Sequence, residues 1–128
     1  MYNDIIIENF SEPKYSGELQ NPHWEFEVGN SVCGDRIRIQ IEIDNEKIAR
    51  VVFRAWGCAT SVATANIFCS SINDNTIETV INRDRKEISQ LLGELEPTQY
   101  HCLDILCELH NQLGQSANQE NIKLCQIK

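Results

Sequence analysis

Alternating hydrophobic and polar residues dominate the first half of the chain. In the run 33–43, every second residue from Ile37 to Ile43 is isoleucine, and the residues between are charged or polar. Side chains of a strand point alternately to opposite faces, so this run predicts a half-buried strand. A turn at 44–46 and a second alternation at 48–56 predict an antiparallel hairpin, and 24–28 predicts a short edge strand.

Helical patterns surround these strands. Residues 1–12 predict a short amphipathic helix that ends at Pro13, and small residues at 59–72 predict a helix followed by shorter ones at 76–82 and 84–92. Leucines at helical spacing between 103 and 113 predict an amphipathic helix from residue 100 to near Gly114. The tail 115–128 is expected to fray or to form a weak helix. The chain therefore predicts a single α+β domain over 1–128, with a small antiparallel sheet of about three strands covered on one face by helices.

Charge and cysteine usage narrow the possible functions. Eleven Lys and Arg against nineteen Asp and Glu give a formal charge of −8, which disfavours nucleic acid and anionic membranes. The run Ile5-Ile6-Ile7 is too short for a signal peptide or a membrane span, so we expect a cytoplasmic protein. Six cysteines without a secretory signal favour reduced, ligand-type thiols over a disulfide framework.

Three of the six cysteines lie where different elements meet. Cys33 opens the isoleucine-rich strand, Cys58 stands between a strand and a helix, and Cys102 follows His101 in the first turn of the leucine-rich helix. Neighbouring antiparallel strands start and end side by side, so Cys33 and Cys58 can meet at one end of the sheet. A helix that covers the sheet can bring Cys102 to the same place. The helix start also favours a thiolate at Cys58.

The other cysteines do not fit this group. Cys69 follows Cys58 by about three helical turns, or ~16 Å, and Cys107 is rotated ~140° around its helix from Cys102. Cys125 lies in the weakly patterned tail. We interpret Cys69 and Cys107 as small apolar residues.

Two further side chains accompany the three thiols. Asp35 shares the parity of the isoleucines, which turns it toward the helix-covered face, and His101 precedes Cys102. Sulfur, nitrogen and oxygen ligands together suit Zn²⁺ or an iron–sulfur cluster. Each residue also has an ordinary structural interpretation: His101 as a capping residue, Asp35 as a strand-edge charge, a lone cysteine as an inert buried side chain. The chain has no Cys-x-x-Cys pair, so the joint pattern carries the prediction.

Three motifs resemble, in order and spacing, the signature of the IscU/NifU-type iron–sulfur cluster assembly scaffolds: Cys33-Gly34-Asp35, Gly57-Cys58-Ala59-Thr60-Ser61 and His101-Cys102. The segment 8–19 is similar to the N-terminal helix and following turn of that family. The resemblance implies that Cys33, Cys58 and Cys102 ligate a labile [2Fe–2S] cluster, with Asp35 and His101 as further ligands or controllers of its lability. Zn²⁺ can occupy the same ligands in such proteins.

The resemblance also implies partners. Sulfur arrives as persulfide from a cysteine desulfurase, Cys102 is by position its acceptor, and the cluster passes to acceptor apo-proteins. An accessible thiol of low pKa suits that acceptor role. We expect a carrier rather than an enzyme, as a monomer or weak dimer.

Two alternatives remain at this point: a zinc-dependent persulfide relay of SufU-like type, and a structural zinc-binding paralogue. The segment Leu95-Glu96-Pro97-Thr98-Gln99 lacks a proline and the lysine of the Leu-Pro-Pro-Val-Lys segment found in the IscU branch. This departure argues against recognition by the dedicated Hsp70-type chaperone. The insertion typical of the SufU branch, between the second and third motifs, is also missing.

Overall fold

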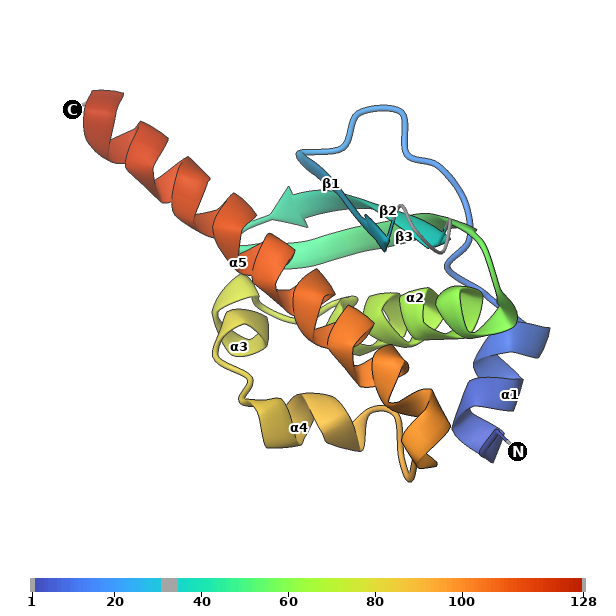
Figure 1. Cartoon of the computed structure of the whole chain (residues 1–128). Helices are drawn as coiled ribbons and strands as arrows, with labels where there is room; N and C mark the ends of the chain where they lie inside the picture. Colours follow the sequence, from blue (N-terminus) through green and yellow to red (C-terminus); the bar gives the residue numbers. More distant parts are fainter. Residues whose placement is uncertain (1, 31–34, 128) are drawn as a thin grey trace.

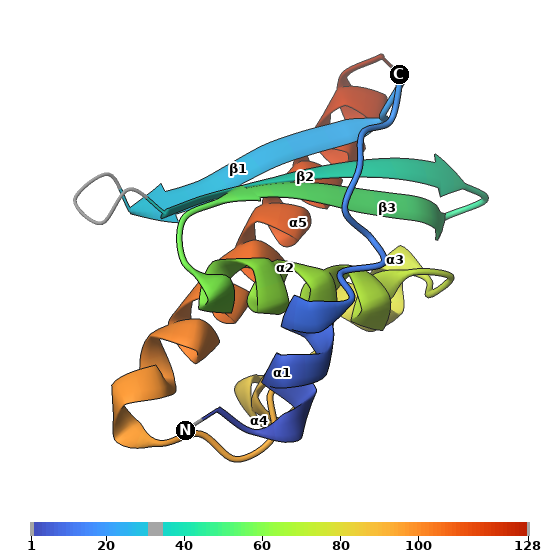
Figure 2. The ribbon, with the colours of Figure 1, turned by 90° about the vertical axis from the view of Figure 1, so that its right-hand side faces the viewer.

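A three-stranded sheet and a layer of helices make up the computed structural model, which describes residues 2–30 and 35–127 (Figure 1). The elements in chain order are α1 (Asp4–Ser11), β1 (Trp24–Asn30), β2 (Asp35–Asp44), β3 (Lys47–Trp56), α2 (Ala59–Ile72), α3 (Ile77–Ile81), α4 (Arg85–Gln90), the 3₁₀ turn η1 (Pro97–Gln99) and α5 (Tyr100–Ile127). The strands are antiparallel in the order β1-β2-β3. Figure 2 shows α1 to α4 and the first part of α5 on one side of the sheet, with the C-terminal end of α5 extending past it, so the predicted α+β architecture is confirmed.

The inward face of the sheet follows the alternation seen in the sequence. Ile37, Ile39 and Ile41 of β2 are buried, and they lie on the same face as Val51 and Phe53 of β3. The outward side chains of β2 include Arg36 and Arg38, which stack over the ring of Trp56. The hairpin turns at Asn45 and Glu46, both with positive φ.

Helices α2 and α5 cover the inward face and supply nearly half of the core residues in the described part of the chain. Along α5, the apolar stripe Leu106, Leu109, Leu113 and Ala117 is buried against α2 and the sheet. This stripe explains why the prediction of a helix end near Gly114 was wrong. The helical spacing continues to Ala117, and a side chain at Gly114 would point into open space. The helix therefore continues to Ile127. This agrees with the second of the two expectations for the tail, that it forms a helix rather than frays.

The remaining helices are short and capped by side chains. Thr76 caps α3, and Asp84 forms a capping box with Glu87 at the start of α4. Gly93 has a positive φ where the predicted helix 84–92 was expected to stop. In the described part of the chain, no helix has the length and apolar character needed to cross a membrane.

Candidate functional site

The predicted meeting of strand ends occurs at one end of the sheet. Arg36 pairs with Trp56, so the first residue of β2, Asp35, lies beside the chain that leaves β3. There Gly57 has a φ of +131°, and a Cβ on it would collide with the Asp35 carboxylate. The carboxylate accepts a hydrogen bond from the Cys58 backbone N–H at 3.2 Å and lies 3.8 Å from Cys58 Sγ. Gly57 is thus the residue that lets the carboxylate and the thiol approach.

Cys58 stands at the N-cap of α2 and is solvent-exposed. Its Sγ lies 2.8 Å from Thr60 Oγ1 and 3.7 Å from Ser61 Oγ. Partial burial raises the pKa of the Cys58 thiol, but hydrogen bonds from the Thr60 hydroxyl and from Ser61 outweigh it, so the net pKa is lowered. The expectation of a stabilised thiolate at this helix start agrees with this direction.

His101 lies in the first turn of α5 with one ring nitrogen engaged. Its Nδ1 is 3.2 Å from the carbonyl oxygen of Thr98, and because a carbonyl only accepts, Nδ1 carries the hydrogen. In the neutral ring Nε2 then presents a lone pair. Nε2 lies 3.4 Å from Thr60 Oγ1 and 3.9 Å from Cys102 Sγ. The imidazole therefore stands between the two thiols.

Cys102 differs sharply from Cys58. Its side chain is 0% exposed. Burial raises the pKa of its thiol, a hydrogen bond to Thr64 opposes the rise, and the nearby Cys58 adds to it. The sequence-based expectation of an accessible, low-pKa sulfur at Cys102 is therefore not met in this structure, because the residue faces the core between α2 and α5. Cys58 is the described cysteine that combines exposure with a lowered pKa.

The structure thus brings four of the five predicted site residues into one continuous row: Asp35, Cys58, His101 and Cys102. Cys33 lies outside the described residues. Within those residues, no three His, Cys, Asp or Glu side chains are close enough to enclose a metal ion. One reason is that the Thr60 hydroxyl stands between Cys58 and His101.

Hydroxyl side chains of α2 are the part of the site that the sequence reasoning missed. Thr60, Ser61 and Thr64 are all buried at the start of this helix and approach the two thiols. For Thr60 and Ser61 the signal was available, because residues two and three positions after a cysteine at a helix start lie within one turn of it; Thr64 lies more than one turn away. The prediction for Cys69 and Cys107 is consistent with their surroundings. Cys69 is fully buried, while Cys107 packs partly against the core with Arg85 Nη1 3.6 Å from its sulfur.

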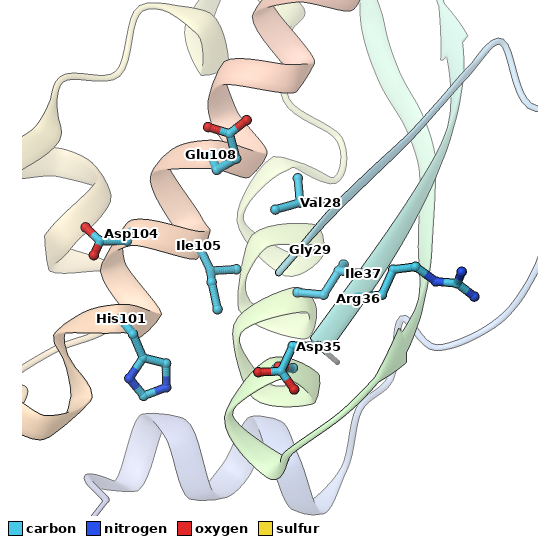
Figure 3. A pocket seen from close by; sticks show the side chains of 10 residues that line it. Val28, Gly29, Asp35, Arg36, Ile37, His101, Asp104, Ile105 and Glu108 are labelled. Carbon is cyan, nitrogen blue, oxygen red and sulfur yellow. The ribbon is translucent and has the colours of Figure 1, made fainter. Parts of the chain in front are cut away.

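A pocket of about 350 Å³ opens beside this row. Figure 3 shows His101, Asp104, Ile105 and Glu108 along α5 on one side of it and Val28 and Asp35 of the sheet on the other, with Ile105 pointing toward the sheet and the Asp104 carboxylate away from it. Asp35 lines the pocket, and its carboxylate contacts Cys58 at the start of α2, which agrees with the predicted orientation toward the helices. The walls of the pocket are mainly apolar, and the carboxylates of Asp35, Asp104 and Glu108 are part of its lining.

Comparison with known proteins identifies the family to which this arrangement belongs. The family model described as "NifU-like N terminal domain" matches residues 1–120. The chain belongs to the NifU-like N-terminal domain family. The resemblance seen in the three motifs is therefore confirmed over nearly the whole sequence.

Curated relatives of this NifU-like chain include both short and long proteins. It is 27% identical over 128 residues to the iron–sulfur cluster assembly scaffold protein IscU 1 of Archaeoglobus fulgidus, covering 100% of this chain and 84% of that protein. It is 27% identical over 106 residues to IscU of Aquifex aeolicus, covering 81% and 68%. The nitrogen fixation protein NifU of Trichormus azollae is 29% identical over 109 residues, covering 79% of this chain but 36% of that protein.

Solved structures share the fold. FiSufU from Fervidobacterium islandicum superposes with a TM-score of 0.63 at 21% identity, covering 88% of this chain and 93% of that one. The N-terminal NifU-like protein of Brucella abortus gives 0.58 at 14% identity, covering 90% and 81%. At these identities the likeness establishes the NifU-like fold alone.

Proposed function

We propose that this protein is an iron–sulfur cluster assembly scaffold, which builds a labile [2Fe–2S] cluster from iron and sulfur and passes it to apo-proteins. The observation that carries the proposal is the row joining Cys58, His101 and Cys102, in which the starts of α2 and α5 place two thiols and an imidazole together. Family membership and the names of the IscU relatives support it. The cluster is cargo, so the protein acts as a carrier rather than as a catalyst, and we place it in the cytoplasm.

Each residue of the row, together with Cys33, has a role in this proposal. Cys33, Cys58 and Cys102 supply thiolates to the cluster, and His101 supplies Nε2, whose lone pair is available because Nδ1 holds the hydrogen. Asp35 stands against Cys58, where its carboxylate acts as a weak further ligand. A mixed set of sulfur, nitrogen and oxygen binds a cluster less tightly than four cysteines, which suits cargo that has to leave.

Anaerobic reconstitution tests this function. Protein incubated with ferrous iron, cysteine and a cysteine desulfurase, with dithiothreitol as reductant, should develop the visible absorption of a [2Fe–2S] cluster. Cys33→Ser, Cys58→Ser and Cys102→Ser should each lose most of it. The matched controls are Cys69→Ser and Cys107→Ser, which change cysteines outside the row. A wild-type protein without cluster absorption would refute the scaffold function, as would cluster formation that survives all three site substitutions.

Sulfur entry is a separate part of the proposal. A thiolate attacks the outer sulfur of the desulfurase persulfide, the S–S bond breaks, and the desulfurase cysteine leaves as thiolate. We propose Cys102 as the final acceptor. Its burial means that the sulfur reaches it only when the start of α5 moves or when another thiol receives the sulfur first. Cys58 is exposed and has the lowered pKa that a first acceptor needs.

Mass spectrometry of the persulfide-labelled chain separates these routes. Transfer directly to Cys102 predicts labelling of Cys102 in the Cys58→Ser variant. Transfer by way of Cys58 predicts labelling of Cys58 in Cys102→Ser and no label in Cys58→Ser. Label in neither single variant would refute both routes.

The same ligand types favour one second candidate. Two thiols, an imidazole and a carboxylate are also a usual ligand set for Zn²⁺, so the row suits a zinc-dependent persulfide relay that builds no cluster. In that case the zinc-loaded protein accelerates desulfurase turnover, while iron and sulfide give no visible absorption. A chelator that removes zinc should abolish the acceleration, and unchanged turnover would exclude the relay.

A further inference from the structure

Thr60 joins the two helix starts that carry the site. Its side chain is 2% exposed in the first turn of α2. Its Oγ1 lies 2.8 Å from Cys58 Sγ on the same helix and 3.4 Å from His101 Nε2 at the start of α5. One buried hydroxyl thus contacts a proposed sulfur ligand and the proposed nitrogen ligand at once.

The hydrogen-bond chemistry of this contact is restrictive. A hydroxyl has one hydrogen to donate and lone pairs to accept with, and His101 Nε2 is an acceptor because Nδ1 donates to the Thr98 carbonyl. Thr60 therefore either receives the Cys58 S–H and donates to Nε2, or donates its hydrogen to the Cys58 thiolate. In both arrangements its short contact is with the sulfur. Burial strengthens this contact, since water does not compete for the hydroxyl.

Thr64, one turn further along α2, makes an instructive contrast. It is also buried, at 1% exposure, and its hydroxyl contacts Cys102. None of its hydrogen bonds in the described part of the chain reaches His101. Thr64 thus reaches one proposed ligand, whereas Thr60 contacts Cys58 of α2 as well as His101 and Cys102 of α5.

We propose that Thr60 is a positioning residue: in the metal-free protein its hydroxyl orients Cys58 and His101 toward each other, and on loading it gives up His101 to the metal and stays hydrogen-bonded to the Cys58 sulfur. The inference rests on the proposed function, because it assigns Thr60 to the same site. Groups that orient metal ligands in this way change metal affinity by about 10- to 100-fold when they are removed.

An isosteric pair of variants tests the role of the hydroxyl. Thr60→Val keeps the shape and removes the oxygen, whereas Thr60→Ser keeps the oxygen and removes the methyl group. The probe is Co²⁺ alone, titrated anaerobically and followed by its thiolate charge-transfer absorption. We expect the Co²⁺ dissociation constant to rise about tenfold in Thr60→Val. Thr60→Ser should stay within about twofold of wild type, and Thr64→Val should show the smaller loss.

A second measurement uses the metal-free protein. The ¹⁵N signal of His101 Nε2, observed by NMR, should move in Thr60→Val and return toward its wild-type position in Thr60→Ser. Equal Co²⁺ affinity in wild type and Thr60→Val would overturn the proposal. So would a Thr60→Ser variant as weak as Thr60→Val, since the methyl group would then be responsible.

These readouts separate the inference from the scaffold function. If Co²⁺ binding and the His101 signal respond to the hydroxyl but iron and sulfide give no cluster, Thr60 positions a metal site and the scaffold function fails. If wild type builds a cluster and Thr60→Val builds and binds equally well, the scaffold function stands and the role of Thr60 fails. A His101 signal that is identical in wild type and Thr60→Val also refutes the role, whatever the protein binds.

Discussion

In both histidines of α5, Nδ1 lies near a backbone carbonyl oxygen, but the other ring nitrogen has different neighbours in each. Nδ1 of His101 lies 3.2 Å from the Thr98 carbonyl, and Nδ1 of His110 lies 2.8 Å from the Leu106 carbonyl. Their Nε2 atoms differ. That of His101, on an exposed residue, faces Thr60 and Cys102, whereas that of His110, on a buried residue, is 3.2 Å from Arg83 Nη1.

His110 has a structural role because its ring is held by Arg83 and Phe68. Arg83 binds it while also donating to the Ser71 hydroxyl and carbonyl at 3.0 and 2.6 Å, and the Phe68 ring meets the imidazole edge-on at 5.1 Å. This cluster ties α2 and the α3–α4 connection to α5. A buried histidine whose two nitrogens are both occupied holds a fold together, while one with an available Nε2 beside thiols can bind cargo.

The largest expected effect is on stability when His110 is removed. His110→Ala deletes a buried ring and removes one of the acceptors of Arg83, so we expect the free energy of unfolding to fall by about 3 kcal/mol. Urea denaturation measures this loss. The matched variant His101→Ala should change stability by less than about 0.5 kcal/mol, because its side chain is exposed. Equal losses in the two variants would contradict the division between the histidines.

For Co²⁺ affinity, unlike for stability, His101 should be the important histidine. His101→Ala removes the proposed nitrogen ligand, and we expect Co²⁺ affinity to fall at least tenfold, or about 1.4 kcal/mol. His23→Ala is the control, since His23 is exposed and its Nδ1 accepts a hydrogen bond from the Ile43 backbone. Its affinity should match wild type. Undiminished binding in His101→Ala would remove this imidazole from the site.

The far half of α5 offers a smaller change that should leave the site untouched. Gly114 lies within the helix, and a Cβ there would meet nothing within 4 Å. Gly114→Ala should therefore stabilise the protein by about 0.8–1 kcal/mol through helix propensity. Thermal unfolding measures the gain, and Co²⁺ affinity should not change. A destabilised variant would mean that the helix does not continue through this position in solution.

This position also shows where sequence reasoning reaches its limit. The isoleucine alternation predicts β2 correctly, because the strand period of two is dictated by the backbone, and the strand-to-helix junction correctly places Cys58 at a helix start. The leucine pattern, whose last member is Leu113, predicts a helix end near Gly114. The helix continues because Ala117 packs against the core. Such packing depends on the surfaces of neighbouring elements, which the local sequence pattern does not describe.

The sequence predicts which residues lie together in the site better than it predicts how exposed each of them is. Strand pairing and helix starts bring Asp35, Cys58, His101 and Cys102 together as expected. Their exposure was not predictable in the same way, because it depends on how α2 and α5 pack. Cys102 proved buried and Cys58 exposed, although both stand at helix starts. The sequence also does not predict the hydrogen bond between Arg83 and His110, because the two residues lie in different parts of the chain that share no pattern.

The smallest expected effect is a pH dependence that belongs to His110 alone. Burial lowers the pKa of His110, its bond to the Leu106 carbonyl opposes this shift, and the Arg83 charge adds to it. Burial also lowers the pKa of Arg83, with Glu87 of α4 acting against it. The unfolded ring titrates near the ordinary value of about 6.5, so below that pH the unfolded chain binds a proton that the native ring resists.

Stability from the neutral ring is thus complete above that pH and is lost as pH falls through the lowered native pKa. Urea denaturation between pH 8 and 5.5 should show wild type losing more stability than His110→Gln, whose amide accepts from Arg83 but does not titrate. The two proteins differ only at residue 110, so the difference between the curves isolates the ring. Parallel curves would mean that protonation of His110 costs the native state nothing, and the contrast between the two imidazoles would then rest on geometry alone.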